Sequence, residues 1–404
     1  MNVNLIQRVY EATNGRLFGH PTQLKTKQQL KATPIIAPVA TIESIATGTP
    51  DLTIRQSDAA HVVAGLPHLE QHRSRVEKLY TNTRIETRHL ALDLLSEDAI
   101  AFSRTATIQE RMKMFQDHAV PLAERVARQA MENAIHDPLD AIPIEESIRL
   151  IVFVSSTGFV APGVDAELIK RLGLRRDIGR ATINFMGCAA AMNGLRVASD
   201  HVRANPTHKA LVICLELSSL NAVFEDDLND VIIHSIFSDG CAAVVIGAGN
   251  VEQSLAQGKV VIRDHLSYLV EETEDGITLG VQDNGITCRL SRFLPDYIQA
   301  GVNPVIEGFL AQHELTKDHI DLWAIHPGGT RIIERSQQSL GLTDDQVAHS
   351  WEVLRQYGNM LSPSVLFVLE RMLLEPNADH RLQTGLAFSF SPGVGIEGIL
   401  FQKA

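Results

Sequence analysis

A cysteine at the start of a predicted helix is the clearest candidate for nucleophilic chemistry in this chain. Cys188 follows Gly187, where an apolar stretch runs into the alanine-rich helical pattern CAAAMNGLRVASDHVRAN. Free N–H groups and the positive dipole end at a helix start stabilise a thiolate, which lowers the pKa of a cysteine. We therefore expect Cys188 to be reactive. The alternative is an inert buried cysteine, which suits Cys214 and Cys241 within continuous apolar segments.

A histidine and an asparagine stand in similarly suggestive positions further along the chain. His326 ends the apolar segment IDLWAIH and precedes Pro-Gly-Gly, so we expect its ring at the carboxyl end of a strand, where α/β proteins bind ligands. Asn359 lies between Gly358 and a long apolar helical pattern. For each residue a structural role is the alternative: a hydrogen-bonded histidine within the fold, and an asparagine that caps a helix.

Other motifs do not indicate a cofactor or a metal. Residues 393–398 match GxGxxG, but too few residues follow for the helix and second strand of a dinucleotide site, so we expect a glycine-rich turn between strands. The sequence has no Walker loop, HExxH or GxSxG motif. Its four cysteines include no CxxC pair, which argues against a zinc site and a disulfide framework. We expect neither a metal nor a bound cofactor.

Short apolar runs that alternate with longer amphipathic ones must position these residues. Strands are expected at 148–156, 210–217 and 242–249, and helices at 69–80 and 117–135. The strands at 210–217 and 242–249 are apolar on both faces, as in a central sheet that helices cover on each side. This pattern predicts a layered α/β architecture, with some antiparallel pairing in the middle of the chain.

The two halves of the chain echo one another. The strand that ends at Ser155 matches the strand that ends at His326, and the strand at 211–219 falls on 382–390 at the same offset. Because the shared identities are few, a chance match of common strand patterns is the alternative. A genuine echo implies a duplicated α/β core with a boundary near Gly258.

The composition excludes several classes of protein. The 404 residues are 45% hydrophobic and 21% charged, which is typical of a globular chain with two or three core-sized units. The 36 Lys and Arg against 48 Asp and Glu give a net charge of −12, which disfavours nonspecific binding to nucleic acid or anionic membrane. No stretch approaches the ~20 apolar residues that span a bilayer, and the first residues lack the apolar core of a signal peptide. We expect a cytoplasmic protein.

In these contexts Cys188, His326 and Asn359 resemble the Cys-His-Asn triad of the type III polyketide synthases, the chalcone-synthase-like branch of the thiolase fold. The resemblance covers the chain from about residue 35 to the end and is closest to the bacterial, mycobacterial-type synthases of alkyl α-pyrones. Further stretches in the family's order carry it: VSSTGFVAPGVD, NFMGCAAAMN, NAVFEDDLNDVIIHS, SIFSDGCAAVVIG, EDGITLGVQDNGITC, DLWAIHPGG, YGNML and FSPG.

This resemblance implies a thiolase-like fold, a duplicated α/β core in five alternating layers (αβαβα). It divides the chain into an N-terminal extension (1–30), a half with the nucleophile (31–257) and a half with the histidine and asparagine (258–404). Members of this branch are usually homodimers, so we expect one.

The family chemistry implies a role for each member of the triad. Cys188 takes a starter acyl group from acyl-CoA as a thioester, with His326 as its imidazolium partner. His326 and Asn359 then form the oxyanion hole in which malonyl-CoA loses its carboxylate and leaves an enolate. The enolate attacks the acyl thioester in a Claisen condensation. Repeated extension and ring closure give an alkyl α-pyrone or a resorcinol.

The resemblance also places a pocket and a coenzyme A site. Phe237 matches a gatekeeping Phe between the coenzyme A tunnel and the cavity, and Cys288 stands where plant synthases carry a second gatekeeping Phe. Both this change and Ala161, in place of a common Met, favour an aliphatic starter. The further residues expected at the pocket are Ser156, Thr157, Ser218, Leu220, Asn221 and Leu361.

The coenzyme A phosphates are assigned to Arg75 and Lys78, although Asn82 replaces a third basic residue and Arg84 is its suggested substitute. A solvated helix face is the alternative for Arg75 and Lys78, and a plain core position is the alternative for Phe237.

Three other functions remain open at this point. The nearest is a ketoacyl synthase III-like enzyme, which uses the same triad for one condensation on an acyl carrier protein. A cysteine hydrolase also fits Cys188 and His326, but it gains nothing from Asn359 beside an apolar helix. A noncatalytic thiolase-fold binding protein leaves Cys188 unreactive. The starter length, the number of extensions and the ring closure do not follow from the sequence.

Overall fold

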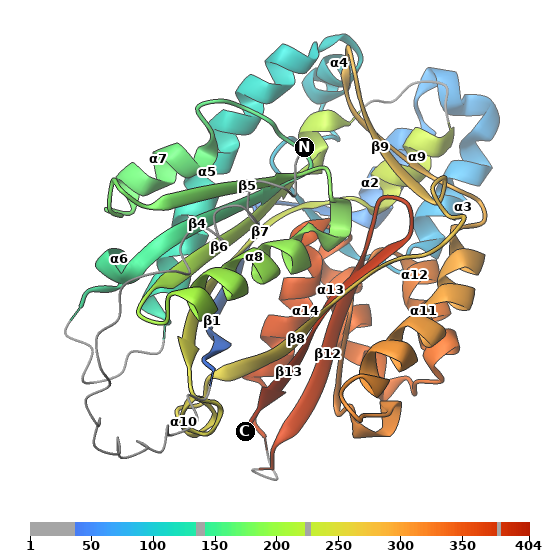
Figure 1. Cartoon of the computed structure of the whole chain (residues 1–404). Coiled ribbons are helices and arrows are strands. Elements are labelled where there is room, and N and C mark those ends of the chain that lie inside the picture. Colours follow the sequence, from blue (N-terminus) through green and yellow to red (C-terminus); the bar gives the residue numbers. More distant parts are fainter. Residues whose placement is uncertain (1–36, 135–141, 223–227, 378–380) are drawn as a thin grey trace, which may run out of the picture. The chain divides into compact units, whose positions relative to one another are not determined.

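A mixed nine-stranded sheet is the centre of the computed structural model, which describes residues 37–134, 142–222, 228–377 and 381–404 (Figure 1). The predicted extension at 1–30 lies outside the described residues. In their order across the sheet the strands are β11 (Leu322–Ile325), β12 (Gln383–Ser391), β13 (Gly395–Lys403), β8 (Val260–Leu269), β1 (Val39–Gly48), β7 (Asp239–Gly249), β6 (Lys209–Leu217), β4 (Ile148–Ser155) and β5 (Gly179–Asn184).

The strand order contains the same arrangement twice. In the first half β1, β7, β6 and β4 are neighbours, and in the second half β8, β13, β12 and β11 repeat them with the same parallel or antiparallel pairing at each step. β1 pairs with β8, which joins the halves into one sheet. The duplicated core that the sequence echo predicted is therefore present.

The constant offset of that echo is wrong for its second pair of strands. Val154 pairs with Cys214, and its counterpart Ile325 pairs with Phe388. Cys214 therefore corresponds to Phe388, whereas the sequence offset placed it opposite Gly385. The loops between these strands differ in length, which a fold accommodates more easily than a change within a strand.

Helices and two small sheets complete the described residues. The small sheets pair β2 (Leu52–Arg55) with β3 (Thr87–Leu90), and β9 (Ile277–Gln282) with β10 (Gly285–Leu290). The α-helices are α2 (Gln56–Ala64), α3 (Arg73–Asn82), α4 (Glu97–Thr105), α5 (Ile108–Glu132), α6 (Ile144–Ser147), α7 (Val164–Arg171), α8 (Ala190–Ala204), α9 (Leu228–Ile236), α10 (Val251–Ala256), α11 (Leu294–Ala311), α12 (Thr330–Leu340), α13 (Ala348–Tyr357) and α14 (Ser362–Leu374). The 3₁₀ turns are η1 (Pro67–His72), η2 (Gly187–Ala189), η3 (Ser218–Asn221), η4 (Lys317–His319) and η5 (Asp345–Val347).

The described residues form five alternating layers of helix and sheet, which pack through one middle and two outer hydrophobic cores. α5 and α7 pack on the outer face of the first half of the sheet, and α11 and α12 pack on the outer face of the second half (Figure 1). α8 and α14 lie between the halves and contribute to a middle core that both halves share. On β6, Val212 faces the middle core and Ile213 the outer one. This period-2 burial explains why the strand is apolar on both faces.

The expected strands are confirmed, and the helix boundaries need correction. α5 begins at Ile108, nine residues earlier than the apolar pattern indicated, because a capping box of Thr107 and Glu110 starts it. Arg111 occupies a buried position on its first turns, where a pattern of apolar residues alone cannot reveal the helix. The expected helix at 69–80 is divided between η1 and α3. The GxGxxG segment forms the turn between β12 and β13, as expected.

No helix among residues 37–134, 142–222, 228–377 and 381–404 has the length and apolar character to cross a bilayer.

Truncation of a side chain in the middle core is expected to destabilise both halves of the sheet. Leu195 on α8 is fully buried there, so Leu195→Ala is expected to lower the free energy of unfolding by about 2–5 kcal/mol through lost burial and a new cavity. Leu374→Ala is the matched control, because this side chain is 76% exposed at the end of α14. Its effect is expected to stay within about 0.5 kcal/mol. Urea denaturation followed by circular dichroism measures both, and equal losses contradict the assignment of Leu195 to a shared core.

Candidate active site

Cys188 sits in the short 3₁₀ turn η2, immediately before α8. Ser156, which follows β4, accepts a hydrogen bond from the backbone N–H of Gly187 (3.0 Å). Ser389 on β12 donates to the carbonyl of Cys188 (2.8 Å). Gly187 has a left-handed φ of +56°, and a Cβ there would lie 3.3 Å from Pro392, so glycine suits both the turn and its surroundings. Strands from both halves thus fix the cysteine backbone.

His326 follows β11, at the strand end that the sequence predicted. Its backbone N–H donates to the carbonyl of Phe388 (3.0 Å), and its carbonyl accepts from Gly328 (2.9 Å). The residue is only 1% exposed, yet neither ring nitrogen has a hydrogen-bond partner in the described part of the chain. Burial lowers the pKa of His326 to about 3, so the imidazole is neutral at pH 7.

The side-chain amide of Asn359 is oriented by two backbone groups. Its Oδ1 accepts from the N–H of Leu361 (2.8 Å), and its Nδ2 donates to the carbonyl of Gly328 (3.1 Å). Nδ2 also lies 4.0 Å from Cys188 Sγ. The N-cap of α14 is Leu361, so the capping role considered for Asn359 is wrong, and its amide faces the thiol instead.

The three side chains line one cavity, which we call the thiol cavity. It measures about 40 Å³, which is space for about three water molecules. Most of its wall is apolar: Ile236, Phe237, Ile277, Leu279, Leu290, Leu294, Ile332, Leu361 and Phe390. Substrate carbons therefore meet hydrocarbon here, and the unsatisfied polar atoms are those of the reactive groups.

The expected low pKa of Cys188 is wrong. The residue is exposed in part to the cavity, but burial raises the pKa of its thiol well above the ordinary value, and the nearby Cys288 adds to the effect. Asn359 acts in the opposite direction with its hydrogen bond, but burial dominates. The thiol is therefore neutral beside a neutral imidazole, because removal from water outweighs the helix-start field.

A second cavity, which we call the hydroxyl cavity, adjoins the first. Four of the predicted pocket residues, Ser156, Thr157, Ser218 and Asn221, line it. It measures about 30 Å³. The walls that both cavities share are Phe237, Leu279, Cys288 and Leu361. Phe237, Cys288 and Leu361 were expected at the pocket, and the structure places them between the two compartments.

The structure does not bring the remaining predicted residues to these cavities. Ala161 lines a separate cavity with Phe153 and Arg180. Leu220 is fully buried in the outer core below α5, so only its neighbours on η3 reach the hydroxyl cavity. On strand and turn alike, adjacent side chains point to different sides, and the sequence match alone does not show which side faces the pocket.

The predicted coenzyme A residues lie on the surface of α3. Arg75 and Lys78 are exposed and line neither cavity. Arg84, the suggested third cation, forms an ion pair with Glu334 (3.3 Å) and stacks 4.4 Å above Trp351. Its guanidinium is thus already engaged.

Of the β9–β10 hairpin, only Cys288 was expected at the site. Ile277 and Leu279 on β9 and Leu290 on β10 line the thiol cavity, and Thr287 lines the hydroxyl cavity. The alternation of Ile277 and Leu279 is the signal for a strand with one apolar face, but it does not reveal what that face covers.

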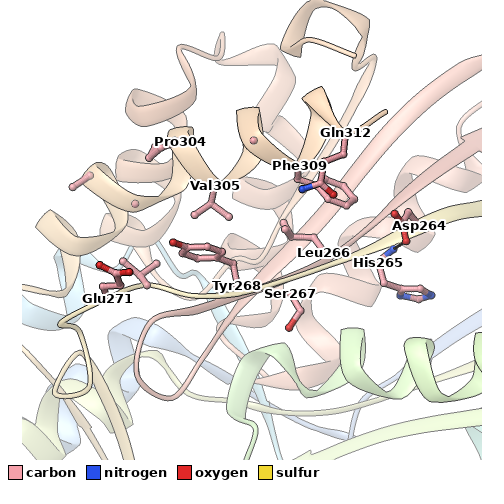
Figure 2. Close-up of a pocket in the computed structure, with 14 residues that line it drawn as sticks. Asp264, His265, Leu266, Ser267, Tyr268, Glu271, Pro304, Val305, Phe309 and Gln312 are labelled. Atoms are coloured by element: carbon pink, nitrogen blue, oxygen red, sulfur yellow. Dashed lines mark hydrogen bonds between the residues drawn. The ribbon is translucent and has the colours of Figure 1, made fainter. Parts of the chain in front are cut away.

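A further groove lies away from these cavities, between β8 and α11. Figure 2 shows Leu266 and Tyr268 of β8 facing Val305 and Phe309 of α11 there. None of the candidate site residues lines it. Among the described residues, no group of three or more His, Cys, Asp or Glu is placed to hold a metal ion.

Glu216 on β6 connects the two halves behind the cavities. Its Oε2 accepts from the N–H of Ser156 (2.9 Å) and the hydroxyl of Thr157 (2.8 Å), and its Oε1 accepts from Ser362 at the start of α14 (2.7 Å). The side chain is fully buried, and burial raises the pKa of Glu216 to about 7 despite these hydrogen bonds. The carboxyl group therefore fixes the end of β4 relative to the start of α14.

Two family models match this chain in succession. The model of the N-terminal domain of chalcone and stilbene synthases matches residues 28–250, and the model of the C-terminal domain matches residues 262–404. The chain belongs to the chalcone and stilbene synthase family. The type III polyketide synthase resemblance and its thiolase-like fold are thereby confirmed, and the ketoacyl synthase III-like alternative is not favoured.

Individual relatives of this synthase agree. It is 51% identical over 364 residues to "Alpha-pyrone synthesis polyketide synthase-like Pks18" of Mycobacterium tuberculosis, a match that covers 90% of this chain and 91% of that protein. The 3,5-dihydroxyphenylacetyl-CoA synthase of Streptomyces toyocaensis is 30% identical over 81% of this chain and 82% of its own. The crystal structure of PKS-I from the brown alga Ectocarpus siliculosus has a TM-score of 0.86 and 44% identity, covering 91% of this chain and 99% of that one. The protein is thus a polyketide synthase, an acyltransferase that performs Claisen condensation.

The raised pKa of Glu216 predicts a pH dependence of stability. The ordinary pKa of a glutamate side chain is 4.5, and burial moves the pKa of Glu216 to about 7 in the folded synthase. Between these values the folded protein keeps a proton that the unfolded chain has lost. The wild type is therefore expected to lose stability relative to Glu216→Gln as the pH rises from about 4.5 to 7, by about 3 kcal/mol.

Urea denaturation of both proteins at about pH 5 and about pH 8 measures this difference, and all other titrating groups cancel between them. An unchanged stability gap at the two pH values contradicts the raised pKa.

Proposed function

We propose that this synthase extends a medium- or long-chain aliphatic acyl-CoA with malonyl-CoA in repeated cycles and releases an alkyl α-pyrone. The observation that carries the proposal is the thiol cavity itself. It is an apolar space in which a thiol, an imidazole without a partner and an amide N–H converge. Each unsatisfied polar atom is placed for a substrate group that the protein does not supply.

In the loading step Cys188 acts as the nucleophile. Its proton passes to a ring nitrogen of His326, and the thiolate attacks the carbonyl carbon of acyl-CoA. The thioester to coenzyme A breaks, and the departing thiolate recovers the proton. Both groups are neutral at rest. The thiolate–imidazolium pair therefore forms only when substrate is bound, because the substrate carbonyl supplies the polar surroundings that the cavity lacks.

In the extension step His326 and Asn359 act as hydrogen-bond donors. One N–H of Asn359 Nδ2 donates a hydrogen bond to the carbonyl of Gly328, and its other N–H faces the cavity towards Cys188 Sγ. These donors hold the thioester oxygen of malonyl-CoA while its carboxylate leaves as carbon dioxide. The resulting enolate attacks the acyl thioester, and Cys188 departs as a thiolate. For the next cycle this thiolate attacks the thioester carbonyl of the extended acyl-CoA, and the coenzyme A thiolate leaves.

The lining of the two cavities supports an aliphatic starter. Phe237, Leu279, Cys288 and Leu361 separate compartments that are each too small for an acyl chain, so these side chains must move when the chain enters. The name of the Mycobacterium relative supports α-pyrone formation, in which an enol oxygen attacks the thioester carbonyl. Closure through carbon, which gives an alkylresorcinol, is the alternative.

The surface of α3 is the proposed site for the coenzyme A phosphates. Val76 and Tyr80 on its buried side belong to the same core as Val231 of α9, whose end carries Phe237. Arg75 and Lys78 are thus cations on the solvent face above the helix that leads to the cavity. A homodimer and a cytoplasmic location, both expected from the sequence, also belong to this proposal.

Product analysis tests the proposed reaction. The synthase is incubated with malonyl-CoA and a series of saturated acyl-CoA starters, and products are identified by mass spectrometry. Alkyl α-pyrones that retain the starter chain are expected. Asn359→Ala is expected to lower their rate of formation by about 10²–10³-fold through loss of one oxyanion donor. Release of free fatty acids alone, or a strict requirement for acyl carrier protein, contradicts the proposal.

Alkylation of Cys188 tests the proton transfer to His326. The rate of modification by iodoacetamide is measured by mass spectrometry across pH for the wild type and His326→Ala. The wild type is expected to react faster than His326→Ala at each pH, because the neutral imidazole accepts the thiol proton as the sulfur attacks the reagent. Identical profiles contradict a role of His326 in activating the thiol, and Cys188→Ser shows which signal belongs to this residue.

A further inference from the structure

Arg88 on β3 is a buried cation that binds main-chain carbonyls. It is 2% exposed. Its Nη1 donates to the carbonyls of His234 (2.6 Å) and Phe237 (2.9 Å), and its Nε donates to Gln56 Oε1 (2.8 Å). The ring of Tyr80 lies 5.9 Å from the guanidinium carbon. Among the described residues no carboxylate is within ion-pair distance of Arg88, although the buried carboxylate of Asp239 is close enough to interact with its charge, so its direct polar contacts are these carbonyls and Gln56.

These contacts complete the C-terminal end of α9. The last carbonyls of a helix have no partner within it and carry the negative end of its dipole, which attracts a cation. Arg88 takes the carbonyl of His234, and Gln56 Nε2 takes that of Ser235 (2.6 Å). The carbonyl of Ile236 accepts from the N–H of Asn359 (2.8 Å). Every terminal carbonyl from His234 to Ile236 is thus accounted for, and Asn359 is part of the set.

Phe237 and Asn359 are neighbours in a short bridge between two chain segments. The N–H of Ser238 donates to the carbonyl of Asn359 (2.9 Å), on the other side of Phe237 from the Ile236 contact. Arg88 holds the carbonyl of Phe237 itself. One guanidinium therefore fixes the segment that presents the shared wall of the two cavities and, through it, the backbone of the amide donor.

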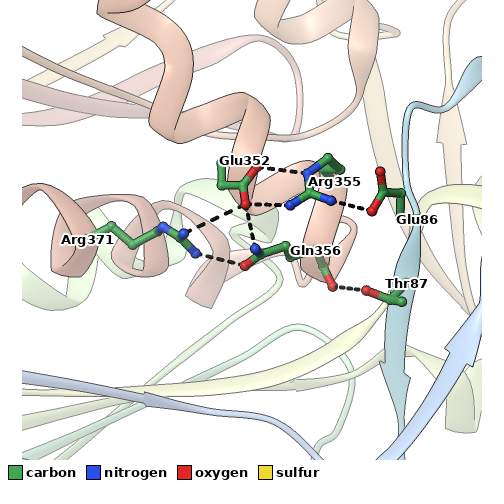
Figure 3. A network of polar contacts seen from close by, with 6 residues as sticks. All are labelled: Glu86, Thr87, Glu352, Arg355, Gln356 and Arg371. Atoms are coloured by element: carbon green, nitrogen blue, oxygen red, sulfur yellow. Dashed lines mark hydrogen bonds and ion pairs between the residues drawn. The ribbon is translucent and has the colours of Figure 1, made fainter.

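Glu86 and Thr87, the two residues before Arg88, bind the end of α13, the helix that precedes Gly358 and Asn359. The N–H of Glu86 donates to the carbonyl of Arg355 (2.8 Å), and the hydroxyl of Thr87 donates to that of Gln356 (2.6 Å). Figure 3 shows the Thr87 contact at the end of α13, where the side chain of Arg355 also bridges Glu86 and Glu352. This network ties the edge of β3 to the helix that leads into the Gly-Asn pair.

The stem of Arg88 also touches that pair directly. A Cβ on Gly358 would lie 3.1 Å from Arg88 Cγ and 3.0 Å from the carbonyl oxygen of Ile236. Gly358 has a φ of +70°, which favours glycine in any surroundings. Arg88 therefore packs against Gly358, the residue before Asn359, while it binds the carbonyl of Phe237, the bridge partner of Asn359.

We propose that Arg88 is a positioning residue for the decarboxylation step, because it clamps the two segments that carry Phe237 and Asn359. The inference rests on the proposed function, in which Asn359 donates to the malonyl thioester. Arg88 is expected to affect decarboxylation and not acylation. Cys188 and His326 are held by Ser389 and Phe388 of β12, independently of Arg88. Loss of the clamp is expected to misplace the amide donor and leave the nucleophile in position.

Arg111 supplies a matched control for a merely structural role. It is likewise fully buried, and it donates to the carbonyls of Leu220 (2.7 Å), Ala222 (3.2 Å) and Ser103 (2.9 Å). None of these carbonyls belongs to the Phe237 or Asn359 segment. Replacement of Arg111 therefore removes a comparable buried cation without touching the bridge.

The experiment measures two steps in Arg88→Met, Arg88→Lys and Arg111→Met. Acylation of Cys188 by a long-chain acyl-CoA is followed by the mass of the intact protein, and decarboxylation of malonyl-CoA is followed without starter. Arg88→Met is expected to lower kcat for decarboxylation by about 10²-fold, the effect of a small displacement of a catalytic group. Acylation and the KM for malonyl-CoA are expected to change by less than about threefold, because Arg88 contacts neither the nucleophile nor Arg75 and Lys78.

Arg88→Lys keeps the charge and the stem but loses the fork, so its kcat is expected to lie between those of wild type and Arg88→Met. It also tests the proposal if Arg88→Met does not fold. Equal losses in both steps, or the same pattern in Arg111→Met, overturn the positioning role. Wild-type decarboxylation in both Arg88 variants overturns it as well. A wild-type enzyme that neither forms the thioester nor decarboxylates malonyl-CoA contradicts the proposed function itself.

Discussion

The imidazole of His326 is buried, and within the described part of the chain neither ring nitrogen has a hydrogen-bond partner, an unfavourable arrangement that the surrounding structure maintains. Such a group costs about 1–3 kcal/mol in a folded protein, so it persists only where neighbouring contacts fix the chain around it. Here the backbone of His326 is bound to β12, and Gly328 stands so close to the ring that a Cβ would lie 3.0 Å from it. Most of the wall around the ring is apolar and supplies no hydrogen-bond partner for the nitrogens among the described residues. Because no described protein group satisfies the ring nitrogens, they remain available to a substrate.

The site is assembled from both halves of a duplicated core. The first half contributes Cys188 at the start of α8, and the second half contributes His326 after β11 and Asn359 before α14. α8 and α14 lie in the middle layer, where the sheet halves share one core, so their starts converge on one cavity. Glu216 reinforces this convergence, because it binds the end of β4 on one side and Ser362 of α14 on the other. A rigid middle layer therefore sets the spacing that acyl transfer requires.

Removal from water governs the charges of this site more strongly than the local helix field. The start of α8 favours a thiolate, yet burial raises the pKa of Cys188, lowers that of His326 and raises that of Glu216. The closed cavity therefore holds neutral groups. An arriving thioester brings polar atoms into the same space, which is the change that makes proton transfer from thiol to imidazole favourable. The mostly apolar lining also limits the access of water, the competing proton source for the enolate.

The sequence by itself determined the alternation of strands and helices, the duplicated order, and the strand and helix ends that carry Cys188, His326 and Asn359, because these follow from local periodicity and turn residues. The family matches confirmed the type of enzyme that those residues indicated. Tertiary structure alone decided that Ala161 and Leu220 face away from the two cavities, that the β9–β10 hairpin closes them, and that Arg88 and Gly358 meet beneath Asn359. It also reversed the expected pKa shift of Cys188. Burial, facing and long-range hydrogen bonds depend on partners far away in the chain, and local patterns carry no record of those partners.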